Sequence, residues 1–191
     1  MTRSLSLANI FEEILPSYGF EQREGQEFMA YHVETTIKER NILIAEAGVG
    51  TGKTFAYLIP ALTLVDWSSE LLRKILIIST NTIVLQHQLM GDISRLIQLL
   101  HIKIDPDSIV LAKGKTNFLC PAKAAIWNIS LGPELCEWVE STSTGDRNEA
   151  PPCSDEIWQA ICVDESCNCS QCEQKTDCCY QKQRQKWLRA R

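Results

Sequence analysis

The stretch from Asn41 to Thr54, Asn-Ile-Leu-Ile-Ala-Glu-Ala-Gly-Val-Gly-Thr-Gly-Lys-Thr, is the feature that most limits how this chain can fold. Its apolar start predicts a buried strand, its glycines predict a tight turn, and its end predicts the first turn of a helix. Backbone N–H groups of such a turn, together with the helix N-terminus, bind phosphate oxygens. The stretch therefore predicts a phosphate-binding loop for a nucleoside triphosphate.

Two side chains of this loop are the candidate catalytic residues. Lys53 can reach the β- and γ-phosphates, and the Thr54 hydroxyl can bind Mg²⁺. Ala47 stands where the strict motif has its first glycine. The loop residues assigned to the nucleotide are Ala47, Gly48, Gly50, Thr51, Gly52, Lys53 and Thr54.

Apolar segments alternate with helical patterns on both sides of the loop. Segments 74–79 and 109–111 are continuous apolar runs, which are typical of strands in a parallel sheet. Helical spacing of apolar residues predicts helices over about residues 7–15, 28–40, 55–66 and 82–100, the last capped by Thr80–Thr82. This alternation predicts an α/β layered domain.

Composition narrows the class of protein. The chain has 191 residues, of which 45% are hydrophobic, so it suits one domain or one domain with a large insertion. Its net charge of −5 means that any nucleic-acid surface must be local. No run is apolar and long enough to cross a membrane, and the N-terminus lacks the pattern of a signal peptide. We expect an intracellular, cytoplasmic protein.

Cysteines dominate the last part of the chain. Seven of the nine lie between positions 153 and 179, and in a reducing compartment they indicate metal binding rather than disulfides. Cys167, Cys172 and Cys178, with Cys120 upstream, could hold a [4Fe–4S] cluster. The close cysteine pairs within 167–172 suit a tetrahedral zinc site equally well. Spacing alone leaves both metals open.

Polar and basic segments occupy the rest of this part. Residues 141–152 are polar and predict a mobile loop. Residues 180–191 predict a helix with five basic residues and no acidic one. The concentrated positive charge consists of Lys113, Lys115, Lys182, Arg184, Lys186, Arg189 and Arg191. It could bind single-stranded DNA weakly and without sequence preference, with Tyr180 or Trp187 stacking on bases, or it could be a solvated helix end.

Five motifs together resemble a known family. They are Arg23-x-x-Gln26-x-x-Met29, Glu46-Ala47-Gly48-x-Gly50-Thr51-Gly52-Lys53-Thr54, Ala56-Tyr57-Leu58-x-Pro60-Ala61-Leu62, Ser79-Thr80-Asn81-Thr82 with Gln86, and Lys113-Gly114-Lys115-x-Asn117-Phe118-Leu119-Cys120. Their order is similar to that of the DinG-like iron–sulfur DNA helicases, relatives of the XPD type within helicase superfamily 2. The resemblance runs from about Phe20 to the end of the chain.

The resemblance implies an ATP-driven motor that moves 5′ to 3′ on single-stranded DNA, with ATP, Mg²⁺ and a [4Fe–4S] cluster. Residues 1–112 would be the N-terminal part of a RecA-like P-loop motor domain, and residues 113–191 a mainly helical iron–sulfur domain at the fork of the DNA. The roles implied are adenine selection for Arg23 and Gln26, DNA-backbone contact for Ser79, Thr80, Asn81 and Thr82, and cluster ligation for Cys120, Cys167, Cys172 and Cys178.

Parts of such a motor are missing from the sequence. Phosphoryl transfer needs an Asp for Mg²⁺ and a Glu that activates water, and the family's Asp-Glu-Ala-His motif and second motor domain are absent. We therefore expect the N-terminal part of a helicase, as a truncated form, an incomplete gene product or half of a split enzyme. One alternative is a self-contained P-loop NTPase with a zinc-binding appendage, using Asp164 and Glu165 as the acidic pair. The other is a non-enzymatic nucleic-acid-binding module.

Overall fold

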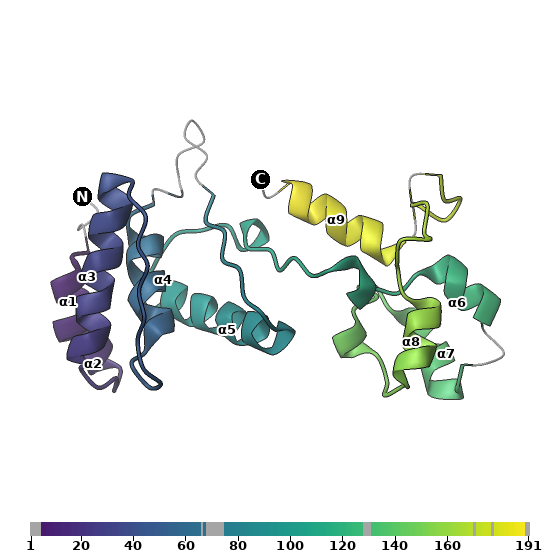
Figure 1. The fold of residues 1–191 in the computed structure, drawn as a ribbon, viewed down its shortest axis with the longest axis horizontal. Coiled ribbons are helices and arrows are strands. Elements are labelled where there is room, and N and C mark those ends of the chain that lie inside the picture. Colours follow the sequence, from purple (N-terminus) through teal and green to yellow (C-terminus); the bar gives the residue numbers. More distant parts are fainter. Residues whose placement is uncertain are drawn as a thin grey trace. The chain divides into compact units, whose positions relative to one another are not determined.

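The computed structural model describes residues 5–65, 67, 75–127, 131–169, 171–176 and 178–189. The chain divides into two compact units, residues 1–106 and 107–191 (Figure 1). The division falls a few residues before the boundary that the sequence analysis placed between 112 and 113. Within the described ranges, none of the helices has the length and apolarity needed to cross a membrane.

Helices make up the regular structure of the first unit. A short helical segment at the N-terminus changes from α-helix to π-helix and back. The elements are α1 (Leu7–Asn9), the π-helix η1 (Ile10–Ile14), α2 (Leu15–Ser17), α3 (Glu24–Glu39), α4 (Lys53–Thr63) and α5 (Ile83–Leu99). The predicted helices are thus present, with ends shifted by a few residues. Asp66, the predicted end of the third helix, lies outside the described residues.

Local sequence explains where these helices begin and end. The Ser6 hydroxyl accepts a hydrogen bond from the Asn9 N–H at the start of α1, and the Thr82 hydroxyl accepts one from the Leu85 N–H at the start of α5, each at 3.2 Å. Arg40 ends α3 in the left-handed conformation, with φ at 58°. The predicted cap at Thr82 is confirmed.

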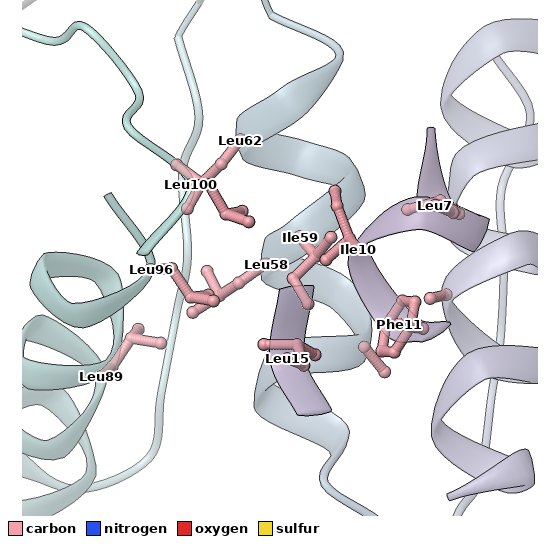
Figure 2. Packing of buried hydrophobic residues seen from close by; sticks show 12 residues of the cluster. Leu7, Ile10, Phe11, Leu15, Leu58, Ile59, Leu62, Leu89, Leu96 and Leu100 are labelled. Atoms are coloured by element: carbon pink, nitrogen blue, oxygen red, sulfur yellow. The ribbon is translucent and has the colours of Figure 1, made fainter. Parts of the chain in front are cut away.

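Helix α4 is the centre of the first core. Its Leu58 and Ile59 are fully buried, in the same cluster as Ile10 of η1 and Leu96 of α5. Figure 2 shows Ile10 and Leu96 lying against the side chains of α4 from these two neighbouring elements. A helix with apolar side chains nearly all round has to be covered on several faces, and α4 meets that expectation. Because α4 begins at Lys53, this core also holds the end of the phosphate-binding loop.

The predicted strands are not formed, so this part of the prediction is wrong for the described chain. Residues 41–47, 75–79 and 109–111 are irregular, and the only ladder contacts among described residues are two isolated bridges in the second unit. Lys74, at the start of one predicted strand, lies outside the described residues. Side chains that a sheet would bury stand in solvent: Ile42 is 93% exposed, Ile44 96% and Ile77 82%. A buried parallel strand needs neighbouring strands on both sides, and none is described here.

The second unit is built from short helices around an extended segment. Its elements are η3 (Lys115–Asn117), α6 (Pro121–Trp127), α7 (Pro133–Ser141), η5 (Arg147–Glu149), α8 (Asp155–Ile161) and α9 (Cys179–Arg189), preceded by η2 (Pro106–Ser108) at the division between the units. It is mainly helical, as expected. Buried Trp158 of α8 anchors this core and donates its indole N–H to the Thr116 carbonyl at 2.8 Å.

The segment 118–120 lies between two other stretches of backbone. The Leu119 N–H donates to the Gly145 carbonyl, and the Cys120 N–H donates to the Ile161 carbonyl, both at 2.8 Å. The Val163 N–H donates to the Phe118 carbonyl, also at 2.8 Å. The middle of the polar loop, predicted to be mobile, is therefore tied to the centre of the unit.

Candidate nucleotide site and cysteine cluster

The phosphate-binding loop has the backbone that its glycines predict. Gly50 and Gly52 have φ of 83° and 79°, in the left-handed region that favours glycine. The Thr51 hydroxyl donates to the Gly48 carbonyl at 2.7 Å and closes the turn. Lys53 then starts α4, so the free N–H groups of the helix N-terminus open onto the loop.

Lys53 is folded back over the loop. Its ammonium donates to the carbonyls of Ala47 at 2.9 Å and Gly48 at 2.8 Å. A cation held by two neutral carbonyls on the loop is placed to exchange them for phosphate oxygens, because charge-assisted hydrogen bonds are stronger.

Thr54, the candidate Mg²⁺ ligand, lies beside a tyrosine of the same helix. It is half-buried and hydrogen-bonds the Tyr57 side chain. Burial raises the pKa of Tyr57 above its ordinary value, and the bond to Thr54 offsets part of that rise. Thr54 is therefore held in place in the first turn of α4.

Arg23 and Gln26, at the start of α3, bind the loop itself. Arg23 donates from Nη1 to the Gly50 carbonyl at 2.7 Å, and Gln26 donates from Nε2 to the Gly52 carbonyl at 2.8 Å. Gln26 is 8% exposed. The resemblance implied that both side chains face adenine, whereas in the structure their donors are directed at loop carbonyls. Sequence reasoning missed this contact because 26 or 27 positions separate the partners.

The segment predicted to touch the DNA backbone organises the start of α5. The Thr80 hydroxyl donates to the Thr82 carbonyl at 3.2 Å, and the Thr82 hydroxyl caps the helix. Ser79 and Asn81 are exposed beside them. One turn further on, the Gln86 side-chain oxygen is buried without a hydrogen-bond partner among the described residues.

Lys113, predicted to contact DNA, lies in a buried ion pair in the structure. Its ammonium lies 2.5 Å from the Asp146 carboxylate, and 2% of its side chain is exposed. A buried lysine needs such a counter-charge, and Asp146 supplies it from the loop after α7. Lys115, two residues later, is partly exposed.

Two of the four predicted metal ligands meet. The sulfur atoms of Cys120 and Cys167 lie 3.8 Å apart. Cys172 is half-buried and Cys178 is buried, but among the described residues no three His, Cys, Asp or Glu side chains come together as a metal site. The structure thus assembles half of the predicted ligand set.

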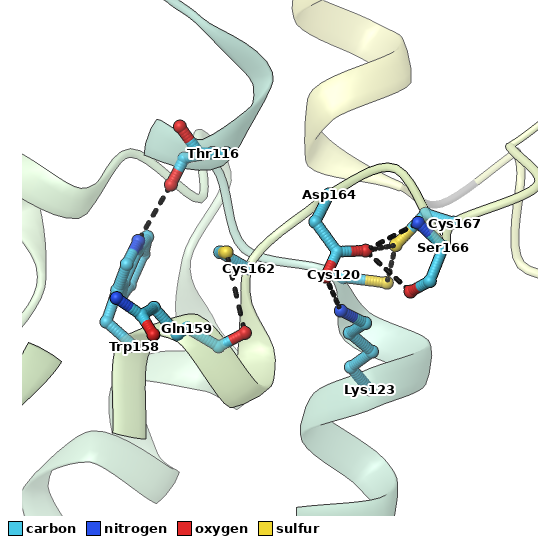
Figure 3. A network of polar contacts seen from close by, with 9 residues as sticks. All are labelled: Thr116, Cys120, Lys123, Trp158, Gln159, Cys162, Asp164, Ser166 and Cys167. Atoms are coloured by element: carbon cyan, nitrogen blue, oxygen red, sulfur yellow. Dashed lines mark hydrogen bonds and ion pairs between the residues drawn. The ribbon is translucent and has the colours of Figure 1, made fainter. Parts of the chain in front are cut away.

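A charged pair lies next to the two thiols (Figure 3). Lys123 donates to Asp164 Oδ2 at 2.6 Å, while Asp164 Oδ1 accepts from the Ser166 N–H at 2.9 Å and from Cys167 Sγ at 3.6 Å. The hydrogen bond from Lys123 holds the pKa of Asp164 well below its usual range. Burial, with the neighbouring Cys167 sulfur, raises the pKa of the Cys120 thiol to about 11. Asp164 is therefore engaged within the second unit, which speaks against the acidic-pair alternative.

The donor chemistry of the thiol pair fits a metal, although the ligand set is incomplete. Metal binding removes the thiol protons, so a metal would have to overcome the raised pKa of Cys120. Two thiolates on one tetrahedral zinc ion, each at about 2.3 Å, lie about 3.8 Å apart. Ligands of a [4Fe–4S] cluster bind different irons and lie farther apart. The spacing of Cys120 and Cys167 is thus closer to that of zinc ligands.

Other residues of the second unit have packing roles that the sequence did not reveal. Cys179 donates to the Thr142 carbonyl at 3.8 Å, and a Cβ added at Gly145 would lie 2.9 Å from the Cys179 Cβ. Phe118 packs against both Tyr180 and Trp187 of α9, with ring centroids 5.6 and 5.7 Å away. The seven-residue spacing of these two aromatic residues on a helix was the available signal.

Comparisons with known proteins agree with the loop geometry. The family model of the DEAD/DEAH box helicases matches residues 29–118. The chain is 32% identical to the probable ATP-dependent helicase YpvA of Bacillus subtilis, covering 90% of this chain and 28% of that protein. It is 35% identical to the ATP-dependent DNA helicase YoaA of Haemophilus influenzae (90% and 27% covered), and 28% identical to the ATP-dependent helicase DinG of Mycobacterium tuberculosis (84% and 27% covered).

The chain therefore spans little more than a quarter of the length of these relatives. A DEAD/DEAH helicase domain implies a RecA-like P-loop fold, which the loop and α4 begin. Residues 29–118 are part of a DEAD/DEAH box helicase domain, and the chain belongs to the helicase family that contains its DinG and YoaA relatives.

Proposed function

We propose that this chain is the N-terminal part of an ATP-dependent DNA helicase and that its loop binds Mg²⁺-ATP. The observation that carries the proposal is the position of Lys53, whose ammonium lies over the loop on two carbonyls. Lys53 would move onto the β- and γ-phosphates, and the Thr54 hydroxyl would bind Mg²⁺. Loop N–H groups and the N-terminus of α4 would hold the phosphate oxygens.

Hydrolysis and movement would need the rest of the motor. Asp164, one member of the acidic pair that the sequence offered as an alternative, is held by Lys123 within the second unit. We therefore expect this chain alone to bind ATP and hydrolyse it poorly. The complete protein would move 5′ to 3′ on single-stranded or forked DNA in the cytoplasm.

Several surfaces could contribute to the DNA path. Exposed Ser79 and Asn81, at the start of α5, are suited to phosphate contacts through a hydroxyl and an amide. Lys115 and the basic side chains of α9 would add positive charge. Lys113 is left out because its ion pair with Asp146 is buried.

Cys120, Cys167, Cys172 and Cys178 would bind a [4Fe–4S] cluster, as in the resembling family. Such a group would supply a covalent link between the segment at Cys120 and the loop that precedes α9. Zinc is the second candidate, supported by the 3.8 Å separation of the Cys120 and Cys167 sulfurs. Iron, sulfide and zinc analysis of protein purified without oxygen separates the two.

Titration with a fluorescent ATP analogue and Mg²⁺ tests the nucleotide site in this chain. We expect saturable binding that is competed by ATP and lost in Lys53→Ala. Absence of binding to the folded wild-type chain would overturn the proposal. DNA-stimulated ATP hydrolysis by the full-length protein, measured with single-stranded and forked oligonucleotides, tests the motor activity.

A further inference from the structure

An ion pair joins the two chain segments that bring Cys120 and Cys167 together. Lys123 Nζ lies 2.6 Å from Asp164 Oδ2. Lys123 follows Cys120 by three positions, in α6, and Asp164 precedes Cys167 by three positions, in the segment after α8. The ion pair and the pair of sulfurs thus lie close to each other and connect the same two segments (Figure 3).

Asp164 also fixes the conformation of the segment that carries Cys167. Its Oδ1 accepts hydrogen bonds from the Ser166 N–H at 2.9 Å and from the Ser166 hydroxyl at 2.6 Å. Cys167 Sγ lies 3.6 Å from the same oxygen, and the Cys167 N–H donates to the Asp164 carbonyl at 3.3 Å. An aspartate that bonds the backbone two residues later forms a local turn. The position of the Cys167 sulfur therefore depends on the position of the Asp164 side chain.

The ion pair extends a connection that the backbone begins. Backbone hydrogen bonds and isolated bridges join residues 118–120 to residues 161–163. Asp164 is the next residue along the chain, and its side chain carries the connection on to α6 through Lys123. Their side chains are 36% and 21% exposed, so the pair is partly shielded from water and should be stronger than a fully exposed pair.

We propose that Lys123 and Asp164 are positioning residues whose ion pair holds the Cys120 and Cys167 sulfurs together before a metal arrives. Order that exists before binding reduces the cost of binding. The inference rests on the proposed metal site. It applies to a [4Fe–4S] cluster and to zinc alike, because either group would be held by both of these thiolates.

The test uses Co²⁺ as the probe, because thiolate–cobalt bonds give an absorption band that reports binding by cysteine. The metal-free chain is titrated with Co²⁺ in the absence of oxygen. We expect Lys123→Met and Asp164→Ala each to bind Co²⁺ roughly three- to tenfold more weakly than wild type. Lys123→Arg, which keeps a charged donor, should recover most of the affinity.

The double variant Lys123→Met/Asp164→Ala separates an effect of the pair from two independent effects. Both substitutions break the same ion pair, so the double variant should bind Co²⁺ about as weakly as Asp164→Ala alone. Losses of affinity that add in the double variant would overturn the inference. Wild-type affinity in both single variants would overturn it as well.

A control variant separates positioning from general damage to the second unit. Asp155→Ala breaks the ion pair between Arg147 and Asp155, which joins segments without a predicted ligand, and it should keep the wild-type affinity for Co²⁺. Tryptophan fluorescence checks that each metal-free variant is folded. A loss in Asp155→Ala equal to that in Lys123→Met would overturn the inference. A wild-type chain that gives no thiolate–cobalt band would instead contradict the proposed metal site itself.

Discussion

Lys113 is buried against Asp146, with 2.5 Å between the ammonium nitrogen and a carboxylate oxygen. The pair joins the segment before Phe118 to the loop after α7, beside the backbone contact between Leu119 and Gly145. The Lys-Gly-Lys sequence that suggested a DNA contact therefore has a structural role at its first lysine.

Asp146→Ala should destabilise the second unit by about 3 kcal/mol, because it leaves a buried ammonium without its counter-charge. Lys113→Met should destabilise the second unit less than Asp146→Ala does, since the Asp146 carboxylate is partly exposed and can be hydrated. The double variant should recover part of the loss. Urea unfolding followed by tryptophan fluorescence measures these differences. Lys38→Met, which removes an exposed lysine paired with the half-buried Glu34, is the control. Unchanged stability of Asp146→Ala would refute the role of the Lys113–Asp146 pair.

Lys53→Ala should lower the affinity for ATP about a hundredfold or more while the helix content stays the same. The substitution removes the charge that meets the phosphates and leaves the core around Leu58 and Ile59 intact. Fluorescence titration and circular dichroism measure the two effects. Lys38→Ala provides the control for loss of a lysine in the same unit, and an ATP affinity equal to that of wild type would reject the loop assignment.

The amount of metal bound by single Cys→Ser variants should show which cysteines are ligands. Cys120, Cys167, Cys172 and Cys178 should each lose bound metal, because a site short of one thiolate is labile. Cys136 and Cys153, which are half-buried against an apolar cluster, should retain it. Metal analysis after purification without oxygen gives the readout. Metal kept after Cys120→Ser but lost after Cys169→Ser or Cys179→Ser would overturn the ligand choice.

Asp92→Asn should raise the stability of the first unit at neutral pH. Burial raises the pKa of Asp92, and the attraction of Arg95 offsets only part of that rise. Ionised Asp92 is therefore less stable in the folded chain than in the unfolded chain. The free energy of unfolding should be highest below the ordinary pKa of an aspartate and should fall as pH rises through the raised pKa of the folded chain. In urea unfolding, the free energy of unfolding of Asp92→Asn should exceed that of wild type by a small amount at pH 7 and by a smaller amount at pH 4. An advantage that grows on acidification would contradict this sign.

Part of this structure could be predicted from residues that are close together in the sequence. Thr82 begins α5, apolar side chains surround α4, and the glycines shape the loop around Lys53, each within a few residues of chain. The strands at 42–44 and 75–77 could not be judged in the same way, because a strand is defined by partners elsewhere. Their exposed isoleucines show that pattern alone does not place them in a sheet.

Long-range contacts account for the remaining differences. Arg23 and Gln26 reach the loop across 27 and 26 positions, and Lys113 reaches Asp146 across 33. The sequence shows the charges and amides but not which partner is within reach. Among many cysteines, spacing likewise could not show that Cys120 and Cys167 meet while the other two predicted ligands do not join them.

The basic helix α9 carries the last prediction. Lys182, Arg184 and Lys186 are exposed on it, and Arg191 lies outside the described residues. Tyr180 and Trp187 pack with Phe118, so base stacking by these rings, as first expected, would require them to leave that cluster. Phosphate contacts should therefore dominate binding of single-stranded DNA, which should be weak, independent of sequence and strongly salt-dependent.

Changing Lys182, Arg184 and Lys186 together to glutamine should lower the affinity for a labelled oligonucleotide. Loss of up to about three phosphate contacts should flatten the slope of log affinity against log salt by about two. A control variant with glutamine at Lys38, Arg40 and Lys103 changes the net charge equally but affects the first unit, and it should keep the wild-type slope. Titrations at several salt concentrations measure both. If the α9 variant keeps the wild-type slope while the control loses it, the positive charge that binds DNA lies in the first unit, and α9 is a solvated helix.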